Sequence, residues 1–150
     1  MRKLRVLVVD DSALFLGAAR NVLSVLPEVA CAEYVRSGAD ALAKLAAFCP
    51  DLMLVDVMMP GMSGFEVLRA VRDCAVVPVM YAITMHDSAD FLAEAIKNGA
   101  DGLIPKREFA EKIRELIADL ASENAKPKVT NQPLSKNDVH TQQEQNNETD

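Results

Sequence analysis

Three aspartates, one threonine and one lysine stand at or just beyond the ends of short apolar runs in this sequence. They are Asp10, Asp11, Asp56, Thr84 and Lys106. Carboxylates, a hydroxyl and an ammonium brought to one place could hold a phosphoryl group, because a metal ion, a hydroxyl and an ammonium neutralise its oxygens. One carboxylate could attack phosphorus and become an acyl phosphate. These residue types therefore predict phosphoryl chemistry.

The aspartates also predict a metal ion. Asp10, Asp11 and Asp56 crowded together would repel and raise one another's pKa unless a cation lay between them. Mg²⁺ fits best, because it takes oxygen ligands and usually keeps several waters. Asp56 stands alone after its apolar run and is the expected nucleophile, which leaves Asp10 and Asp11 to hold the metal. The phosphate-binding patterns G-x-x-x-x-G-K-[ST] and G-x-G-x-x-G are both missing from the sequence, so a nucleotide is not indicated.

These side chains can meet only if their apolar runs are strands of one sheet. The pattern predicts strands at Leu4–Val9, Ala30–Val35, Leu52–Val55, Val79–Ile83 and Gly102–Ile104. Helical patterns occupy Ser12–Leu26, Ser37–Phe48, Gly64–Asp73, Asp87–Asn98 and Arg107–Leu120. Strict alternation of strand and helix predicts an α/β fold with a doubly wound, five-stranded parallel sheet. In such sheets the ligand site lies at the carboxyl ends of the strands.

Composition excludes several function classes. The 150-residue chain has a formal net charge of −6, 5% aromatic residues and no Trp, so a nucleic acid is not an expected partner. No uncharged run approaches the roughly 20 residues that span a bilayer. The first apolar run ends at Asp10, too soon for a signal peptide, and we expect a cytoplasmic protein. The wide spacing of Cys31, Cys49 and Cys74 argues against a zinc site or a disulfide framework.

The composition changes near residue 121. From Ala125 to Asp150 the chain is rich in Asn, Gln, Thr, Lys and Glu, and few larger apolar residues remain. Such a segment cannot bury enough surface to offset its ordering entropy. We therefore expect a folded domain over residues 1–122 and a polar, disordered tail over residues 123–150.

Four sequence blocks carry a family resemblance. They are Val6–Ser12 with its paired aspartates, Asp51–Gly64 around Asp56, Ala82–Thr84, and Gly99–Lys106. In this order and spacing, the blocks closely resemble the receiver domain of two-component response regulators over residues 4–121. The resemblance implies a (βα)5 flavodoxin-like receiver fold, in agreement with the strand and helix pattern.

The resemblance also implies roles for the chemical residues. Asp56 matches the phosphoacceptor, which takes a phosphoryl group from a histidine kinase or a phosphotransfer protein. Thr84 matches the hydroxyl that moves to bond the phosphoryl group, and Lys106 matches the cation that pairs with it. The chain would then be a signalling switch that promotes its own phosphorylation and dephosphorylation, not an enzyme acting on a separate substrate.

The same resemblance implies the Mg²⁺ ligands. Asp11 matches the direct ligand, and Asp10 matches the acid that usually acts through water. Asp56 itself and the backbone carbonyl of Met58 complete the protein's share of the site.

Two positions depart from the common receiver pattern. Leu103 stands three residues before Lys106, where receivers usually carry an aromatic switch residue. Pro105 precedes Lys106 and Arg107 follows it, whereas receivers usually place Pro after the lysine. Phosphoacceptor chemistry needs neither feature, but we expect an altered route from the site to the output surface.

The first predicted helix is apolar around most of its circumference, with few polar residues between Ala13 and Leu26. An exposed apolar patch tends to mark an interface, and receivers dock kinases and phosphotransfer domains at this helix. We expect docking near Ser12–Leu26, with Leu14 and Leu16 flanking the contact or a dimer interface. The alternative is that the helix is more deeply buried.

Several functions remain open from the sequence. A stand-alone receiver would act by binding another protein or by passing its phosphoryl group onward. A metal-dependent phosphohydrolase would use the same chemistry, although haloacid dehalogenase-like enzymes carry D-x-D after the first strand, where this chain has Asp10, Asp11 and Ser12. The chain could also be a receiver-like scaffold that is never phosphorylated, or one part of a larger regulator.

Overall fold

Five parallel strands form the central sheet of the computed structural model, which describes residues 2–86, 88–122 and 128–129. Their order across the sheet is β2-β1-β3-β5-β6. The bounds are β1 (Leu4–Val9), β2 (Val29–Val35), β3 (Leu52–Asp56), β5 (Val79–Thr84) and β6 (Gly102–Pro105). The predicted α/β class and the five-stranded parallel sheet are confirmed.

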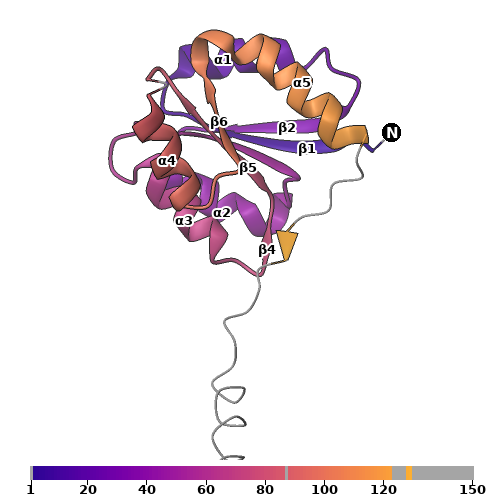
Figure 1. Ribbon diagram of the computed structural model, residues 1–150. Coiled ribbons are helices and arrows are strands. Elements are labelled where there is room, and N and C mark those ends of the chain that lie inside the picture. The colour runs from indigo at the N-terminus through magenta and orange to yellow at the C-terminus, as the bar shows by residue number, and fades with distance from the viewer. Residues whose placement is uncertain (1, 87, 123–127, 130–150) are drawn as a thin grey trace, which may run out of the picture.

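Helices cover both faces of this sheet (Figure 1). One face carries α1 (Ala13–Leu23) and α5 (Phe109–Ser122). The other face carries α2 (Gly38–Phe48), α3 (Gly64–Arg72) and α4 (Ala89–Lys97). The sheet is therefore shielded from water on both sides, which explains why its strands are nearly continuous runs of Val, Leu, Met and Ile.

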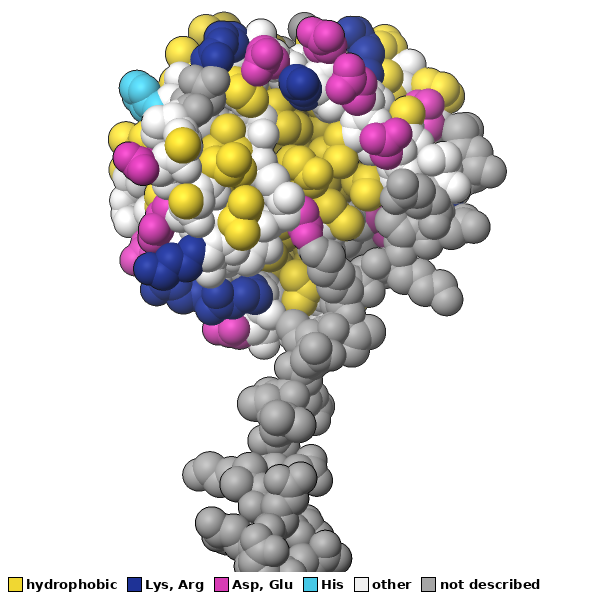
Figure 2. All heavy atoms as spheres, in the orientation of Figure 1, with side chains coloured by type: hydrophobic (Ala, Val, Ile, Leu, Met, Phe, Trp, Pro, Cys, Tyr) yellow, Lys and Arg dark blue, Asp and Glu magenta, His cyan; other side chains and the backbone are white. Residues whose placement is uncertain are grey.

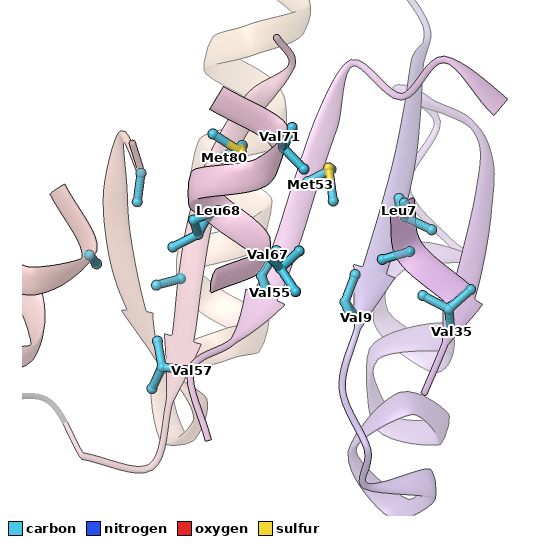
Figure 3. Packing of buried hydrophobic residues seen from close by; sticks show 14 of the residues in the cluster. Leu7, Val9, Val35, Met53, Val55, Val57, Val67, Leu68, Val71 and Met80 are labelled. Carbon is cyan, nitrogen blue, oxygen red and sulfur yellow. The ribbon is translucent and has the colours of Figure 1, made fainter. Parts of the chain in front are cut away.

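Each face of the sheet has its own hydrophobic core. Alternate residues of one strand serve the two cores, as Leu52 and Leu54 pack under α1 and α5 while Met53 and Val55 pack under the other helices. In Figure 3, Val55 of β3 lies beside Val67 of α3. The central strands are thus packed from both sides, and this packing holds the side chains at their carboxyl ends in place.

Serine residues cap the N-termini of the first four long helices. The side chains of Ser12, Ser37, Ser63 and Ser88 each accept a hydrogen bond from the backbone N–H three residues later. At α3 the cap is reciprocal, because the Glu66 side chain accepts the backbone N–H of Ser63. All four caps follow strands at the carboxyl edge of the sheet, so capping helps to fix the loops around that edge.

Several predicted helix boundaries move in the structure. The first helix ends at Leu23, three residues before the predicted end. A short 3₁₀ helix, η1 (Lys106–Glu108), precedes α5, so α5 begins at Phe109 and not at Arg107. Helix α4 begins at Ala89, and the predicted start at Asp87 falls outside the described residues.

A second, two-stranded sheet lies outside the central one. Strand β4 (Val76–Val77), which the sequence pattern did not predict, pairs antiparallel with β7 (Lys128–Val129). Lys128 and Val129 are the only described residues of the predicted tail, and the rest of residues 123–150 lies outside the described part. Within the described residues, no helix is long and apolar enough to cross a membrane.

Candidate functional site

The five chemical residues named from the sequence meet at the carboxyl edge of the sheet. Strand β1 leads directly into Asp10 and Asp11, and Asp56 is the last residue of β3, the middle strand. Thr84 ends β5 and lies opposite Pro105 of β6 in the parallel register, which brings the following Lys106 to the same edge. The prediction that these strand ends converge holds for all five residues.

An acidic cluster occupies the centre of this edge. One carboxylate oxygen from each of Asp10, Asp11 and Asp56 lies within 4.8 Å of the others. Asp10 is completely buried and Asp56 is 4% exposed. Backbone groups orient two of these carboxylates, since the N–H of Ser12 donates to Asp10 Oδ1 at 2.9 Å and the N–H of Met58 donates to Asp56 Oδ1 at 3.3 Å.

Lys106 supplies the positive charge that faces this cluster. Its Nζ lies 2.7 Å from Asp10 Oδ2 and 3.6 Å from Asp56 Oδ2. Apart from this ammonium, Asp10 Oδ2 has no hydrogen-bond partner among the described residues. Within the described part of the chain, the Lys106 ammonium is the cation paired with two of the three clustered carboxylates, so the site carries excess negative charge.

The surroundings of Asp56 raise the pKa of its carboxyl group from 3.8 to about 6. Burial away from water is the largest cause, and the negative charge of Asp10 adds to it. The charge of Lys106 and the backbone N–H of Met58 act in the opposite direction but do not cancel the rise. In the absence of a metal, the folded protein therefore resists ionisation of Asp56.

We expect Asp56→Asn to stabilise the metal-free protein, by about 2 kcal/mol at about pH 7.5 and by almost nothing at about pH 3. Ionised Asp56 penalises the folded state, so the penalty grows as pH rises from about 4 to about 6 and stays constant above that range. At about pH 3, below the ordinary pKa of 3.8, the carboxyl group is mostly protonated in both the folded and the unfolded state. Urea unfolding in EDTA at the two pH values measures the difference.

Asp119→Asn is the control for this stabilisation, because Asp119 is an exposed residue of α5 far along the chain from the cluster. Its effect should stay within about 0.5 kcal/mol at both pH values. Equal stabilisation by Asp56→Asn at the two pH values, or destabilisation at about pH 7.5, would contradict the raised pKa of Asp56.

Thr84 is buried, and its Oγ1 accepts the backbone N–H of His86 at 2.9 Å. The exposed ring of His86 stacks on Phe91 of α4, with the ring centroids 5.9 Å apart. Phe91 in turn stacks on Phe65 of α3 at 6.4 Å. The loop that follows Thr84 is therefore tied to the helices beside it through aromatic rings.

Two predictions about exposed residues have different outcomes. Leu14 on α1 is 87% exposed, as expected for a residue beside a docking patch. The same prediction for Leu16 is wrong, because Leu16 is buried in the core beneath α1 and α5. Leu103, at the position where receivers usually carry an aromatic residue, is half-buried against the core on the other face.

Two residues that bear on the site were not predicted from the sequence. The Arg36 guanidinium donates two hydrogen bonds to the backbone carbonyl of Asp11, at 3.0 and 3.3 Å. The ring of Phe15 lies under the Lys106 ammonium, with Nζ 4.7 Å from the ring centroid. Phe15 stands three residues after the capping Ser12, which puts it on the first turn of α1, but only the packing of α1 against α5 reveals what it faces.

The chemistry of the donor set fits a magnesium ion. Three carboxylates gathered at one edge offer hard oxygen ligands, and Asp10 Oδ2 lacks a hydrogen-bond donor other than Lys106 among the described residues. A divalent cation would neutralise the charge that Lys106 leaves uncompensated.

Comparison with known proteins agrees with this geometry. Residues 6–118 match the response regulator receiver domain family. A protein-glutamate methylesterase/protein-glutamine glutaminase of Myxococcus xanthus (strain DK1622) is 35% identical over 122 residues, which cover 79% of this chain and 35% of that protein. The chain spans about a third of the length of several such methylesterases.

Solved receiver domains share the fold. The receiver domain of the response regulator NarL from Mycobacterium tuberculosis matches with a TM-score of 0.73 and 32% identity, covering 82% of this chain and 99% of that chain. The receiver domain of the histidine kinase CKI1 from Arabidopsis thaliana, solved with Mg²⁺ and BeF₃⁻, matches with a TM-score of 0.67 and 28% identity, covering 79% and 91%. By sequence, by topology and by the acidic edge of its sheet, this chain belongs to the response regulator receiver domain family.

Proposed function

We propose that this chain is a phosphorylation-dependent signalling switch in which Asp56 accepts a phosphoryl group from a histidine kinase or a phosphotransfer protein. The observation that carries the proposal is the position of Asp56. It ends the middle strand of the sheet, is nearly buried, and lies between an acidic cluster and the Lys106 ammonium.

The transfer step follows from this arrangement. A carboxylate oxygen of Asp56 attacks the phosphorus of the donor phosphohistidine, and the bond between phosphorus and nitrogen breaks. The donor imidazole leaves with the electron pair of that bond and then takes up a proton. Ionised Asp56 is the reactive form, because a carboxylate oxygen is a much stronger nucleophile than an oxygen of the neutral acid.

The other residues of the site act on the phosphoryl oxygens. The ammonium of Lys106 neutralises negative charge beside Asp56. The oxygen of Thr84 accepts the His86 N–H, which leaves its O–H to donate to a phosphoryl oxygen. When Mg²⁺ is bound, it supplies further neutralisation of the phosphoryl charge. Asp10, Asp11, Asp56 and the carbonyl of Met58 are the groups that would hold it.

Phosphorylation would change the structure through charge. An acyl phosphate adds about two negative charges beside Thr84 and Lys106, which favours conformations that bring the hydroxyl and ammonium closer. The rings of His86 and Phe91 link the loop that follows Thr84 to α4. A partner that binds the rearranged α4 and β6 would therefore select the phosphorylated form.

Two apolar surfaces suit the partners of such a switch. Exposed Leu14 on α1 and exposed Val25, just after the end of α1, support docking of the phosphoryl donor near Ser12–Leu26. Figure 2 shows hydrophobic side chains gathered between α4 and α5, and Leu92 and Ile96 of α4 are exposed. This second surface supports the proposal that the switch acts by binding a protein target in the cytoplasm or by relay of its phosphoryl group.

Intact-mass spectrometry after incubation with acetyl phosphate tests the proposal. With Mg²⁺, the wild-type chain should gain about 80 Da, the mass of one phosphoryl group. EDTA or Asp56→Ala should abolish the gain. Because an acyl phosphate can be short-lived, NMR spectra with BeF₃⁻ and Mg²⁺ provide a second measurement. Absence of both the mass gain and any BeF₃⁻-dependent change in the wild-type protein would contradict the proposed function.

A further inference from the structure

The Lys106 side chain must be held in one place to serve the site. A lysine has a long flexible stem, and fixing its ammonium costs conformational entropy. In this chain its Nζ is nevertheless directed into the acidic cluster, and the side chain is only 11% exposed. The contacts around the side chain must therefore direct the ammonium.

The aromatic ring of Phe15 contacts the Lys106 ammonium. The Lys106 Nζ lies 4.7 Å from the centroid of the Phe15 ring, a distance at which the negative face of the ring attracts a cation. The Phe15 ring packs in turn against Phe109, with the ring centroids 5.1 Å apart and the ring planes at 74°. Phe109 is a buried residue at the start of α5, so it supports the ring from the core.

The backbone of Phe15 is fixed to the same short segment that carries Asp10. The N–H of Ser12 donates to Asp10 Oδ1 at 2.9 Å, and the N–H of Phe15 donates to Ser12 Oγ at 3.2 Å. Two hydrogen bonds thus connect the carboxylate that attracts Lys106 to the helix turn that carries the ring. The distance between the anion and the aromatic face is therefore determined by local structure.

We propose that Phe15, supported by Phe109, is a positioning residue that holds the Lys106 ammonium toward Asp56. The proposal rests on the proposed function, because the ammonium matters there for the phosphoryl oxygens. The ring and the Asp10 carboxylate contact the ammonium together, and Asp56 Oδ2 lies 3.6 Å from it. An ammonium held at this point is already withdrawn from water. It can therefore bind a phosphoryl oxygen on Asp56 without a further cost for removing its hydration.

The alternative is that Phe15 only fills the core beneath α1 and α5, against which it packs. Phe15→Leu separates the two roles, because leucine keeps an apolar side chain at this position but has no aromatic face. Phe15→Tyr keeps the face. Phe48→Leu is the matched control, because the Arg5 guanidinium lies 4.4 Å from the Phe48 ring centroid, in a cation–π contact that involves none of the site residues.

The first measurement is the NMR shift of the Lys106 ε-methylene protons in the full chain labelled with ¹³C-lysine and assigned with Lys106→Arg. A group above an aromatic face is shielded, so these signals should lie upfield of those of the other lysines. They should return to the ordinary range in Phe15→Leu and stay upfield in Phe15→Tyr and Phe48→Leu. Ordinary shifts in the wild-type protein would overturn the proposal without any variant.

The second measurement is the rate of phosphorylation by acetyl phosphate with Mg²⁺. Phe15→Leu should slow it about fivefold, while Phe15→Tyr and Phe48→Leu keep the wild-type rate. Phe15→Met offers the same test if Phe15→Leu does not fold. An unchanged rate in a folded variant without the ring would overturn the proposal, even if the NMR signals move. Absence of phosphorylation in the wild type would instead count against the proposed function, and the Lys106 shifts would still report on the contact.

Discussion

Lys106→Met is expected to lower the free energy of unfolding of the metal-free protein by about 3 kcal/mol at about pH 7.5. The substitution keeps a chain of similar length but removes the only charge partner that the described residues give to Asp10, which is completely buried. Loss of one partner of a buried pair leaves the other charge without compensation, and this costs more than the pair itself contributes. Urea unfolding in EDTA measures the change.

The matched control is Lys44→Met. Lys44 forms an ion pair with Glu33 at 3.1 Å, but both side chains are substantially exposed. Removal of such a surface pair should change stability by less than about 1 kcal/mol. Equal effects of Lys44→Met and Lys106→Met would contradict the view that Lys106 compensates buried charge.

Addition of Mg²⁺ should separate the charge effect from a packing effect. A cation that binds only the folded state stabilises it, and Lys106→Met leaves the acidic cluster more negative than in the wild type. Mg²⁺ should therefore stabilise the variant more than it stabilises the wild-type protein. Phosphorylation of the variant should still be at least about tenfold slower, because the phosphoryl oxygens lose their ammonium.

Gly64→Ala is expected to destabilise the protein by about 3 kcal/mol or more, although it adds only one methyl group. A Cβ at this position would lie 2.0 Å from the backbone oxygen of Asp56 and 2.6 Å from Cα of Val57. The backbone there cannot easily shift, since the N–H of Val57 donates to the carbonyl of Ile83 at 3.2 Å. The start of α3 would have to move away from the strand that carries the phosphoacceptor.

Gly17→Ala is the control for this prediction. Gly17 lies within α1, and apart from its chain neighbours and the nearby backbone of α1, no atom of the described residues lies within 4 Å of the Cβ that alanine would add. Alanine favours a helix more than glycine does, so Gly17→Ala should stabilise the protein by about 0.5–1 kcal/mol. Urea unfolding of both variants gives the comparison, and wild-type stability of Gly64→Ala would show that α3 does not approach Asp56 this closely.

Much of the site was predictable because strand ends can be read from apolar runs. In a parallel sheet every strand has its carboxyl end at the same edge, so Asp10, Asp56 and Thr84 had to converge once their strands were identified. Predicting the position of Lys106 required one more step, because Pro105 extends β6 and places the lysine just beyond it.

Other features depend on which face of a helix meets the core. Helix α1 is apolar on most sides, so its sequence could not tell exposed Leu14 from buried Leu16. The contact between Phe15 and Lys106 arises from the packing of α1 against the start of α5, two segments far apart in the chain. The short strand β4 (Val76–Val77) has too few residues for a periodic pattern, and it was missed for that reason.

The measurement that tests the central claim most directly is reductive trapping of the phosphorylated residue. Borohydride reduces an acyl phosphate to an alcohol and releases phosphate, so an aspartyl phosphate becomes homoserine, about 14 Da lighter than aspartate. After treatment with acetyl phosphate and Mg²⁺, tandem mass spectrometry of the digested protein should find homoserine at position 56 and nowhere else. Homoserine at another aspartate, or trapping that persists in Asp56→Ala, would contradict the assignment of Asp56 as the phosphoacceptor.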